Sequence, residues 1–142
     1  MDYKELLEKQ QDEASTFSKG KIYWVFGSTE TEVIDKLEEK GVKPEQVTSI
    51  GAGGFILTEY LPDLKKLLDK QAKERREYAL KHIYEVVQYY CWDYELYISL
   101  SYDLKSLCLE LVDLTEEEIQ ANKEEITRAY KDYCKEFEKL NI

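Results

Sequence analysis

The pattern of apolar and polar positions divides this chain into a mixed first part and a second part that is helical almost throughout. All six glycines lie at or before Gly54, and both prolines lie at or before Pro62. Turns and strands are therefore expected early, and long helices afterwards. A chain of 142 residues suits one domain. We expect a single domain over residues 1–142, with an α-β-α-β-β part at 1–58 and a helical part at 59–142.

Three short apolar runs in the first part are typical of strands. Residues 21–26, KIYWVF, combine β-branched and aromatic side chains, and the runs VTSI and FIL lie on either side of Gly51 to Gly54. The last two runs are expected to form a hairpin. The predicted fold class is α+β, with a small antiparallel sheet of about three strands packed with a mostly helical C-terminal part.

Two helices are expected around the first strand. Residues 2–18 carry a loose apolar stripe among strong helix formers. In the segment STETEVIDKLEEKG, the spacing of Thr29 and Glu32 fits a capping box, in which each residue bonds the backbone amide of the other. Gly41 suits the position after the last helical turn, where φ is usually positive.

The second part contains one helical pattern of about 35 residues after Pro62, followed by shorter helices. We expect the long pattern to break or bend once, because helices of that length are uncommon in compact domains. Three later sites have N-cap chemistry, namely Ser101 or Asp103, Thr115 with Glu118, and Asn122 with Glu125. The last helix is expected to bury a stripe made of Ile126, Ala129, Tyr130, Tyr133, Phe137 and Leu140.

The stretch SIGAGGFIL contains three of the six glycines, which raises the question of a phosphate cradle. It lacks the Lys and Ser/Thr of a P-loop, and Ile56 stands where a dinucleotide fingerprint needs its third glycine. A tight hairpin turn is the favoured interpretation, because glycine adopts positive φ at little steric cost. The alternative is an anion nest, in which Gly51, Gly53 and Gly54 would contact a ligand.

Tyrosines are concentrated in the segment from Tyr78 to Tyr102, which holds seven of the twelve, together with Trp92. Apolar positions cover nearly the whole circumference of such a helix, so it is either central or faces a partner. Tyr and Trp are enriched at interfaces. Trp92 and Tyr94 are therefore candidate stacking residues for a nucleotide, Tyr97 is a candidate interface residue, and a homodimer is one expected partner arrangement.

The charge balance argues against direct nucleic-acid binding. Asp and Glu outnumber Lys and Arg by 30 to 20, for a net charge of −10. A partner with a basic surface is more plausible, because complementary fields speed encounter. The candidate interaction residues are the acidic runs Glu116, Glu117, Glu118, Glu124 and Glu125. Their placement in first helical turns is also explained by the helix dipole alone.

No catalytic or metal-binding pattern is recognisable. His82 is the single histidine, and no partner that would orient it as a general base can be identified. Cys91, Cys108 and Cys134 are far apart and form no CxxC, which favours a reducing compartment. The chain lacks an apolar signal core and any run of 18 apolar residues. We expect a cytosolic protein with no enzymatic activity, no cofactor, no metal and no membrane contact.

Several short motifs together resemble a family of small phage and prophage proteins of unassigned function. These motifs are LLEKQQDE, the aromatic strand IYWVF, SIGAGGFI, YEL within a helix, and LTEEEI after a short helix. In the family pattern the stretch after YEL is polar and includes an Asn-His-Glu run, whereas Tyr97, Ile98 and Ser99 stand there in this chain. The resemblance implies a mobile-element context and transfers no catalytic residue.

These observations lead to two functional expectations. The first is a phage accessory protein that binds and inhibits a host factor, plausibly a defence component, through an acidic surface. The alternative is a small-ligand binder that sequesters a nucleotide-derived immune signal at the glycine turn and the tyrosine-rich helix. Salt dependence of target binding supports the first, and a thermal shift with nucleotides supports the second.

Overall fold

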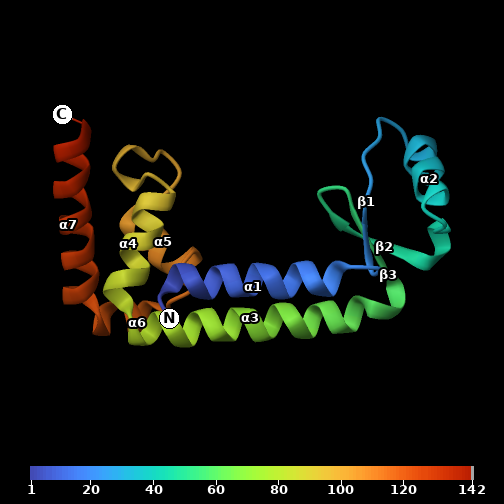
Figure 1. The fold of residues 1–142 in the computed structure, drawn as a ribbon. Helices are drawn as coiled ribbons and strands as arrows, with labels where there is room; N and C mark the ends of the chain where they lie inside the picture. Colours follow the sequence, from blue (N-terminus) through green and yellow to red (C-terminus); the bar gives the residue numbers. More distant parts are fainter. Residues whose placement is uncertain (142) are drawn as a thin grey trace. The chain divides into compact units, whose positions relative to one another are not determined.

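A computed structural model describes residues 1–141, and it confirms the α+β class (Figure 1). Within these residues, seven α-helices accompany one three-stranded antiparallel sheet. The chain divides into two compact units. We call residues Leu7–Gln71 the sheet unit, and Met1–Leu6 with the chain from Ala72 onward the helical unit. The single-domain expectation stays a prediction.

The sheet has the strand order β1-β3-β2. Its strands are β1 (Ile22–Trp24), β2 (Val47–Gly51) and β3 (Gly54–Leu57). The hairpin predicted around the glycines is therefore confirmed. The first strand is shorter than the expected 21–26, although the N–H of Val25 still donates to the carbonyl of Gly53 at 2.8 Å. A bulge in β2 between Ser49 and Gly51 leads into the turn.

Local sequence signals fix both ends of α2 (Glu30–Glu39) in the sheet unit. Thr29 caps its start by accepting from the N–H of Glu32, and Gly41 follows its end with φ +79°. Only half of the expected capping box forms. The Glu32 carboxylate accepts from the N–H of Ser28 at 3.0 Å instead of returning to Thr29. The short 3₁₀ turn η1 (Pro44–Gln46) then leads into β2.

Two helices contribute residues to both units, namely α1 (Tyr3–Ser18) and α3 (Leu61–Lys81). Within the sheet unit, Gln10 of α1 and Gln71 of α3 are joined by two hydrogen bonds, and Lys70 forms an ion pair with Glu13 at 3.2 Å. The 3₁₀ turn η2 (Thr58–Tyr60) connects β3 to α3. The buried apolar side chains of this unit are Val25, Leu37, Val42 and Ile56.

The long helical pattern breaks once, as expected, at His82. This residue has φ −138° and separates α3 from α4 (Ile83–Asp93). The 3₁₀ turn η3 (Leu96–Ile98) and three further helices follow, namely α5 (Leu104–Glu110), α6 (Glu116–Ala121) and α7 (Lys123–Asn141). The core of the helical unit is formed chiefly by Val86, Val87, Cys91, Leu107, Cys108, Ile126, Ala129 and Tyr133.

The first turn of α1 is anchored in the helical unit by tyrosines. The hydroxyls of Tyr3 and Tyr90 are 2.6 Å apart, and the N–H of Tyr3 donates to Glu85 at 2.9 Å. The hydroxyl of Tyr78 also donates to Glu85. Burial, followed by this bond to Glu85, raises the pKa of Tyr78 to about 12. Tyr78 therefore keeps its proton at neutral pH and serves as the hydrogen-bond donor to Glu85.

The predicted caps of the later helices are confirmed in two cases and wrong in one. Asp103 accepts from the N–H of Ser106, and Thr115 forms a complete capping box with Glu118. Asn122 forms no such box with Glu125. Because α7 begins immediately after α6, the amide of Asn122 instead donates back to the carbonyl of Glu118 at 2.8 Å.

Candidate functional site

The end of α4, the turn η3 and the C-terminal half of α7 place three aromatic rings together at the surface of the helical unit. We define the aromatic surface by these rings, which belong to Trp92, Tyr97 and Phe137. Tyr97 stacks on Phe137 with ring centroids 4.6 Å apart and an angle of 15° between the planes. Trp92 lies 6.5 Å from Phe137 and makes an edge contact with Tyr133. Phe137 therefore links the two residues that the sequence singled out.

The backbone before Tyr97 explains why its ring projects outward. Glu95 adopts the left-handed conformation with φ +46°, which ends the path of α4 and starts η3. The N–H of Tyr97 then donates to the hydroxyl of buried Tyr133 at 2.9 Å. The Tyr97 hydroxyl donates to Glu138 at 3.2 Å, and this bond raises the pKa of Tyr97. Tyr97 is thus held by three contacts, one through its backbone N–H, one through its ring face and one through its hydroxyl, although the residue is exposed.

Exposed aliphatic side chains lie close in sequence to the rings. Ile98 and Leu100 follow Tyr97 along the chain, and Leu100 is fully exposed. Leu140 lies one helical turn after Phe137. The prediction that Leu140 belongs to the buried stripe of α7 was wrong, because 73% of this residue is exposed, and Phe137 is only half-buried. Aromatic and aliphatic side chains near one another on a soluble protein are typical of an interaction site.

The charge around the aromatic surface is predominantly negative. The helical unit contains 18 acidic and 11 basic residues, for a net charge of −7, whereas the sheet unit has 12 and 9, for a net charge of −3. Residues 82–104 contain four acidic residues and no Lys or Arg. The four are Glu85, Asp93, Glu95 and Asp103. On α7 the charges next to Phe137 are balanced, because Glu136 and Glu138 lie between Lys135 and Lys139. Glu136 pairs with Lys139 at 3.2 Å.

Three of the five glutamates proposed from the sequence as interaction residues are paired with cations of the same unit. Glu116 lies 3.2 Å from Lys105, Glu118 lies 2.7 Å from Arg76, and Glu125 lies 3.0 Å from Arg128. Within the described part of the chain, Glu117 and Glu124 form no ion pair. These two carboxylates are the more available members of the set.

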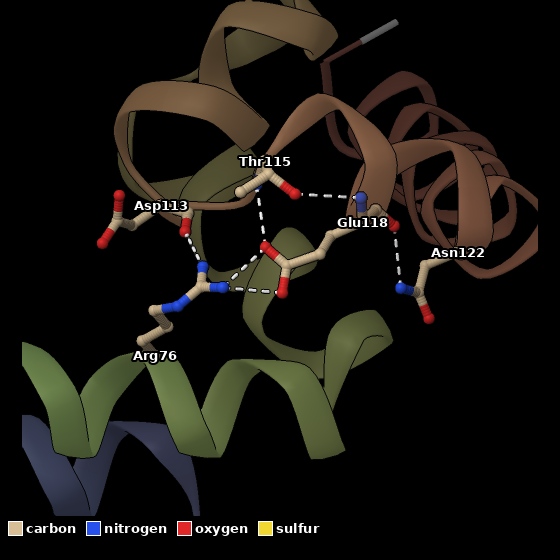
Figure 2. Close-up of polar contacts among 5 residues, drawn as sticks. All are labelled: Arg76, Asp113, Thr115, Glu118 and Asn122. Carbon is tan, nitrogen blue, oxygen red and sulfur yellow. Dashed lines mark hydrogen bonds and ion pairs between the residues drawn. The ribbon is translucent and has the colours of Figure 1, made fainter.

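Figure 2 shows that Glu118 is held inside a polar cluster. Its carboxylate accepts from Arg76 through both oxygens, at 2.7 and 2.8 Å, and from the N–H of Thr115 at 2.9 Å. The Thr115 amide, followed by Arg76, lowers the pKa of Glu118. Arg76 also donates to the carbonyl of Asp113, which has φ +63°. This cluster fixes the connection between α5 and α6, so a structural role accounts for Glu118.

The glycine turn is packed by aromatic rings of the sheet unit. A Cβ at Gly53 would lie 2.4 Å from the ring of Phe26, and one at Gly54 would lie 2.8 Å from the ring of Trp24. Gly51 and Gly53 have φ of +88° and +80°. Gly53 and Gly54 are therefore required for close packing, and Gly51 and Gly53 for their positive φ. Nucleotide binding at this turn stays a prediction.

The remaining stacking candidates belong to the other unit. Trp92 and Tyr94 lie at the end of α4, and Tyr94 contacts Tyr90 and Tyr102 through ring edges and tilted faces. Phe137 and the exposed aliphatic residues were missed as site residues, because helical spacing alone placed Phe137 in the core. The sequence did contain one signal for an exposed apolar site, namely the apolar run Tyr97-Ile98 immediately before a loop.

The three cysteines lie on α4, α5 and α7. Cys91 and Cys108 are fully buried, and burial raises their pKa values to about 12 and about 11. Within residues 1–141, no group of three His, Cys, Asp or Glu side chains could hold a metal ion. No helix among these residues is long and apolar enough to cross a membrane.

This architecture defines a class of α+β protein in which five helices follow a small antiparallel sheet. A model of a family of unknown function, DUF7659, matches residues 2–136, and the chain belongs to that family. No curated protein and no solved structure matches the chain. The resemblance to a family of unassigned function is confirmed to this extent, and its phage context stays a prediction.

Proposed function

We propose that this protein acts without catalysis by binding another protein through the aromatic surface of its helical unit. The single observation that carries the proposal is the exposed stack of Tyr97 on Phe137, held in an acidic setting. Trp and Tyr side chains carry a large share of binding energy at protein interfaces. Truncation of one such ring typically costs about 2 kcal/mol or more of affinity.

The rigidity of Tyr97 favours binding. Association costs about 0.5–1.5 kcal/mol for each flexible side chain that it immobilises. The backbone N–H of Tyr97 already donates to Tyr133, and its hydroxyl donates to Glu138. Its ring already stacks on Phe137. Most of the ordering cost is therefore met during folding, and the exposed ring face is ready for a partner.

The charges indicate what kind of partner fits. Around Trp92 and Tyr97 the nearby charges are acidic, namely Asp93, Glu95 and Glu138, and no Lys or Arg occurs in 82–104. Around Phe137, Lys135 and Lys139 balance Glu136 and Glu138. Complementary charge raises the rate of encounter and excludes partners of like charge. The expected partner has an apolar centre surrounded by Lys and Arg side chains.

The phage resemblance supplies the biological context of the proposal. A small protein of a mobile element that occupies a functional surface of a host protein would inhibit it, and defence components are the class of target that such elements gain most from blocking. The free cysteines support action in the reducing host cytosol. In this proposal, inhibition follows from occupancy alone and consumes no substrate.

The test is a comparison of tagged variants in capture from the natural host, followed by measured affinity for the purified target. Tyr97→Ala and Leu100→Arg change exposed residues at the proposed surface. Trp24→Ala removes an equally accessible ring from the sheet unit and is the matched control. We expect at least a tenfold weaker affinity for the first two variants, an unchanged affinity for the control, and weaker binding as salt rises.

Two results would contradict the proposal. One is a target whose affinity is the same for Tyr97→Ala, Leu100→Arg and wild type. The other is a purified protein that turns over a substrate and loses that turnover after a single substitution.

A further inference from the structure

The first turns of α3 carry an apolar groove on the sheet unit that nothing within the described chain covers. The groove has a volume of about 760 Å³, and its lining residues are Thr58, Leu61, Pro62, Leu64, Lys65, Leu68 and Asp69. Leu61 and Leu68 are 36% and 51% exposed, respectively. All of these residues belong to one unit.

The leucines follow the spacing of a helix–helix contact. Leu61, Leu64 and Leu68 stand at i, i+3 and i+7, which places them on one stripe of α3. Such a stripe normally packs against a neighbouring helix, because leaving it in water forgoes the free energy of burial. The adjacent part of α3 has such a neighbour within the unit, because Gln71 is hydrogen-bonded to Gln10 of α1.

Two opposite charges line the same flank of this stripe. Lys65 and Asp69 are four residues apart on α3, a spacing at which side chains can pair along a helix. Neither forms an ion pair within residues 1–141, although other i,i+4 pairs of this chain do, for example Lys36 with Glu32. Both charges therefore remain available to a partner that lies along the groove.

The order of Lys65 and Asp69 along α3 allows two copies of the helix to pair opposite charges when they lie antiparallel. A two-fold axis perpendicular to α3 brings the same flank of two helices together in antiparallel directions. With the axis midway between Lys65 and Asp69, each Lys65 faces Asp69 of the other copy, and the leucine stripes meet beside them. A parallel two-fold arrangement would instead place this flank on opposite sides of the two helices, where Lys65 and Asp69 could not meet across the contact. The groove thus fits a second copy of this chain.

We propose that the protein forms an antiparallel homodimer through the groove at Thr58 to Asp69. This inference is independent of the binding function proposed for the helical unit. A homodimer was also expected from the sequence, but on account of the tyrosines, none of which lines this groove. A contact of about two to three helical turns is at the low end of interface sizes, so we expect a dissociation constant in the micromolar range.

Sedimentation velocity between about 5 and 500 µM tests the dimer over the expected range of affinity. Lys65→Glu and Asp69→Lys each place like charges opposite one another twice across the axis, and each should weaken the dimer about tenfold or more. The double variant restores opposite charges and should restore the dimer. A mixture of the two single variants should form the heterodimer. Leu68→Glu should abolish association.

Lys66→Glu is the matched control, because Lys66 is an exposed neighbour that does not line the groove. Circular dichroism confirms that each variant is folded. A monomeric wild type at all concentrations overturns the proposal. It is also overturned by a dimer that survives Leu68→Glu unchanged, by a control as damaging as Lys65→Glu, or by single variants that neither recover in combination nor associate when mixed.

Discussion

Gln10 and Gln71 are bound to each other twice, each through its side-chain amide to the other's backbone carbonyl. Both bonds are 2.9 Å long, and both residues are 4% exposed. Amide groups of this kind are costly to bury unless they are hydrogen-bonded. Because the acceptors are backbone atoms at fixed heights along α1 and α3, the pair sets the register between these helices within the sheet unit.

The pair predicts that the same isosteric change, Gln to Glu, costs far more at buried position 71 than at exposed position 11. Gln71→Glu buries a carboxylate next to the carbonyl of Gln10 and should lower the free energy of unfolding at pH 7 by about 2–4 kcal/mol. Burial raises the pKa of that carboxyl in the folded state, so the penalty is present above the folded pKa. It fades as pH falls towards the unfolded value of about 4.3.

Urea unfolding from pH 7 to pH 4 measures this difference. Gln11→Glu changes the same amide to a carboxylate at an exposed position of α1, and it should leave stability within about 0.5 kcal/mol of wild type. Equal effects of the two substitutions would show that the buried pair has no special role.

The Arg76–Glu118 cluster predicts a second pH dependence. The pKa of Glu118 is lowered in the folded protein, chiefly by the N–H of Thr115 and then by Arg76. Its charged form therefore adds stability above the ordinary pKa of 4.5, and this contribution is lost as pH falls through the lower folded pKa. Glu118→Gln should lower Tm at pH 7, and its difference from wild type should shrink below pH 4.5.

Thermal unfolding monitored by circular dichroism provides the measurement. Glu117→Gln is the control, since Glu117 is exposed and forms no ion pair within the described residues. We expect Tm of this control to follow wild type at every pH. A constant gap between Glu118→Gln and wild type down to acid pH would contradict the assignment.

Features of the fold that depend on neighbouring residues were predictable from the sequence. The Thr115–Glu118 capping box and the glycine after α2 depend on residues within one helical turn. The hairpin around Gly51 pairs residues that are at most ten positions apart, from Val47 with Leu57 inward. The break at His82 was expected from helix length, but its position was not. The Asn122 cap failed because the end of α6 competes for the same side chain.

The candidate site was predictable only in part, because its contacts join distant segments. Trp92 and Tyr97 were identified from composition, but their link through Phe137 spans 45 and 40 residues. Glu118 was named both as a capping-box residue and as a candidate interaction residue, and its pairing with Arg76, 42 residues away, was not foreseen. Helical spacing predicts which residues share one face of a helix. It does not predict which other segment, or solvent, that face contacts.

The glycine turn predicts different costs for glycines that look alike in sequence. Gly53→Ala combines a positive φ with a Cβ that would lie 2.4 Å from Phe26, so we expect a loss of about 2–4 kcal/mol of stability. Gly51→Ala meets the same φ penalty, but nothing lies within 4 Å of its Cβ. Its cost should be about 1–2 kcal/mol.

Denaturant unfolding of the two variants and of the double variant Gly53→Ala with Phe26→Ala tests this account. Removal of the ring should bring the cost of Gly53→Ala, measured in the Phe26→Ala background, down to that of Gly51→Ala. Equal costs for both glycines in the wild-type background would show that ring packing does not select Gly53. A rise in Tm with added nucleotides that Gly53→Ala abolishes would favour the ligand-binding alternative instead.

The burial of the cysteines predicts an ordered reaction with thiol reagents. Cys91 and Cys108 are fully buried with pKa values of about 12 and about 11, whereas Cys134 is partly exposed. Because the thiolate is the reactive form and must also be accessible to the reagent, Cys134 should react first in the native protein.

Mass spectrometry after treatment with a maleimide should show one modification at early times and three in denaturant. Cys134→Ser should remove the early modification, while Cys108→Ser should leave it unchanged. Rapid labelling of Cys91 or Cys108 in the native state would mean that the core between α4, α5 and α7 opens far more readily than its packing indicates.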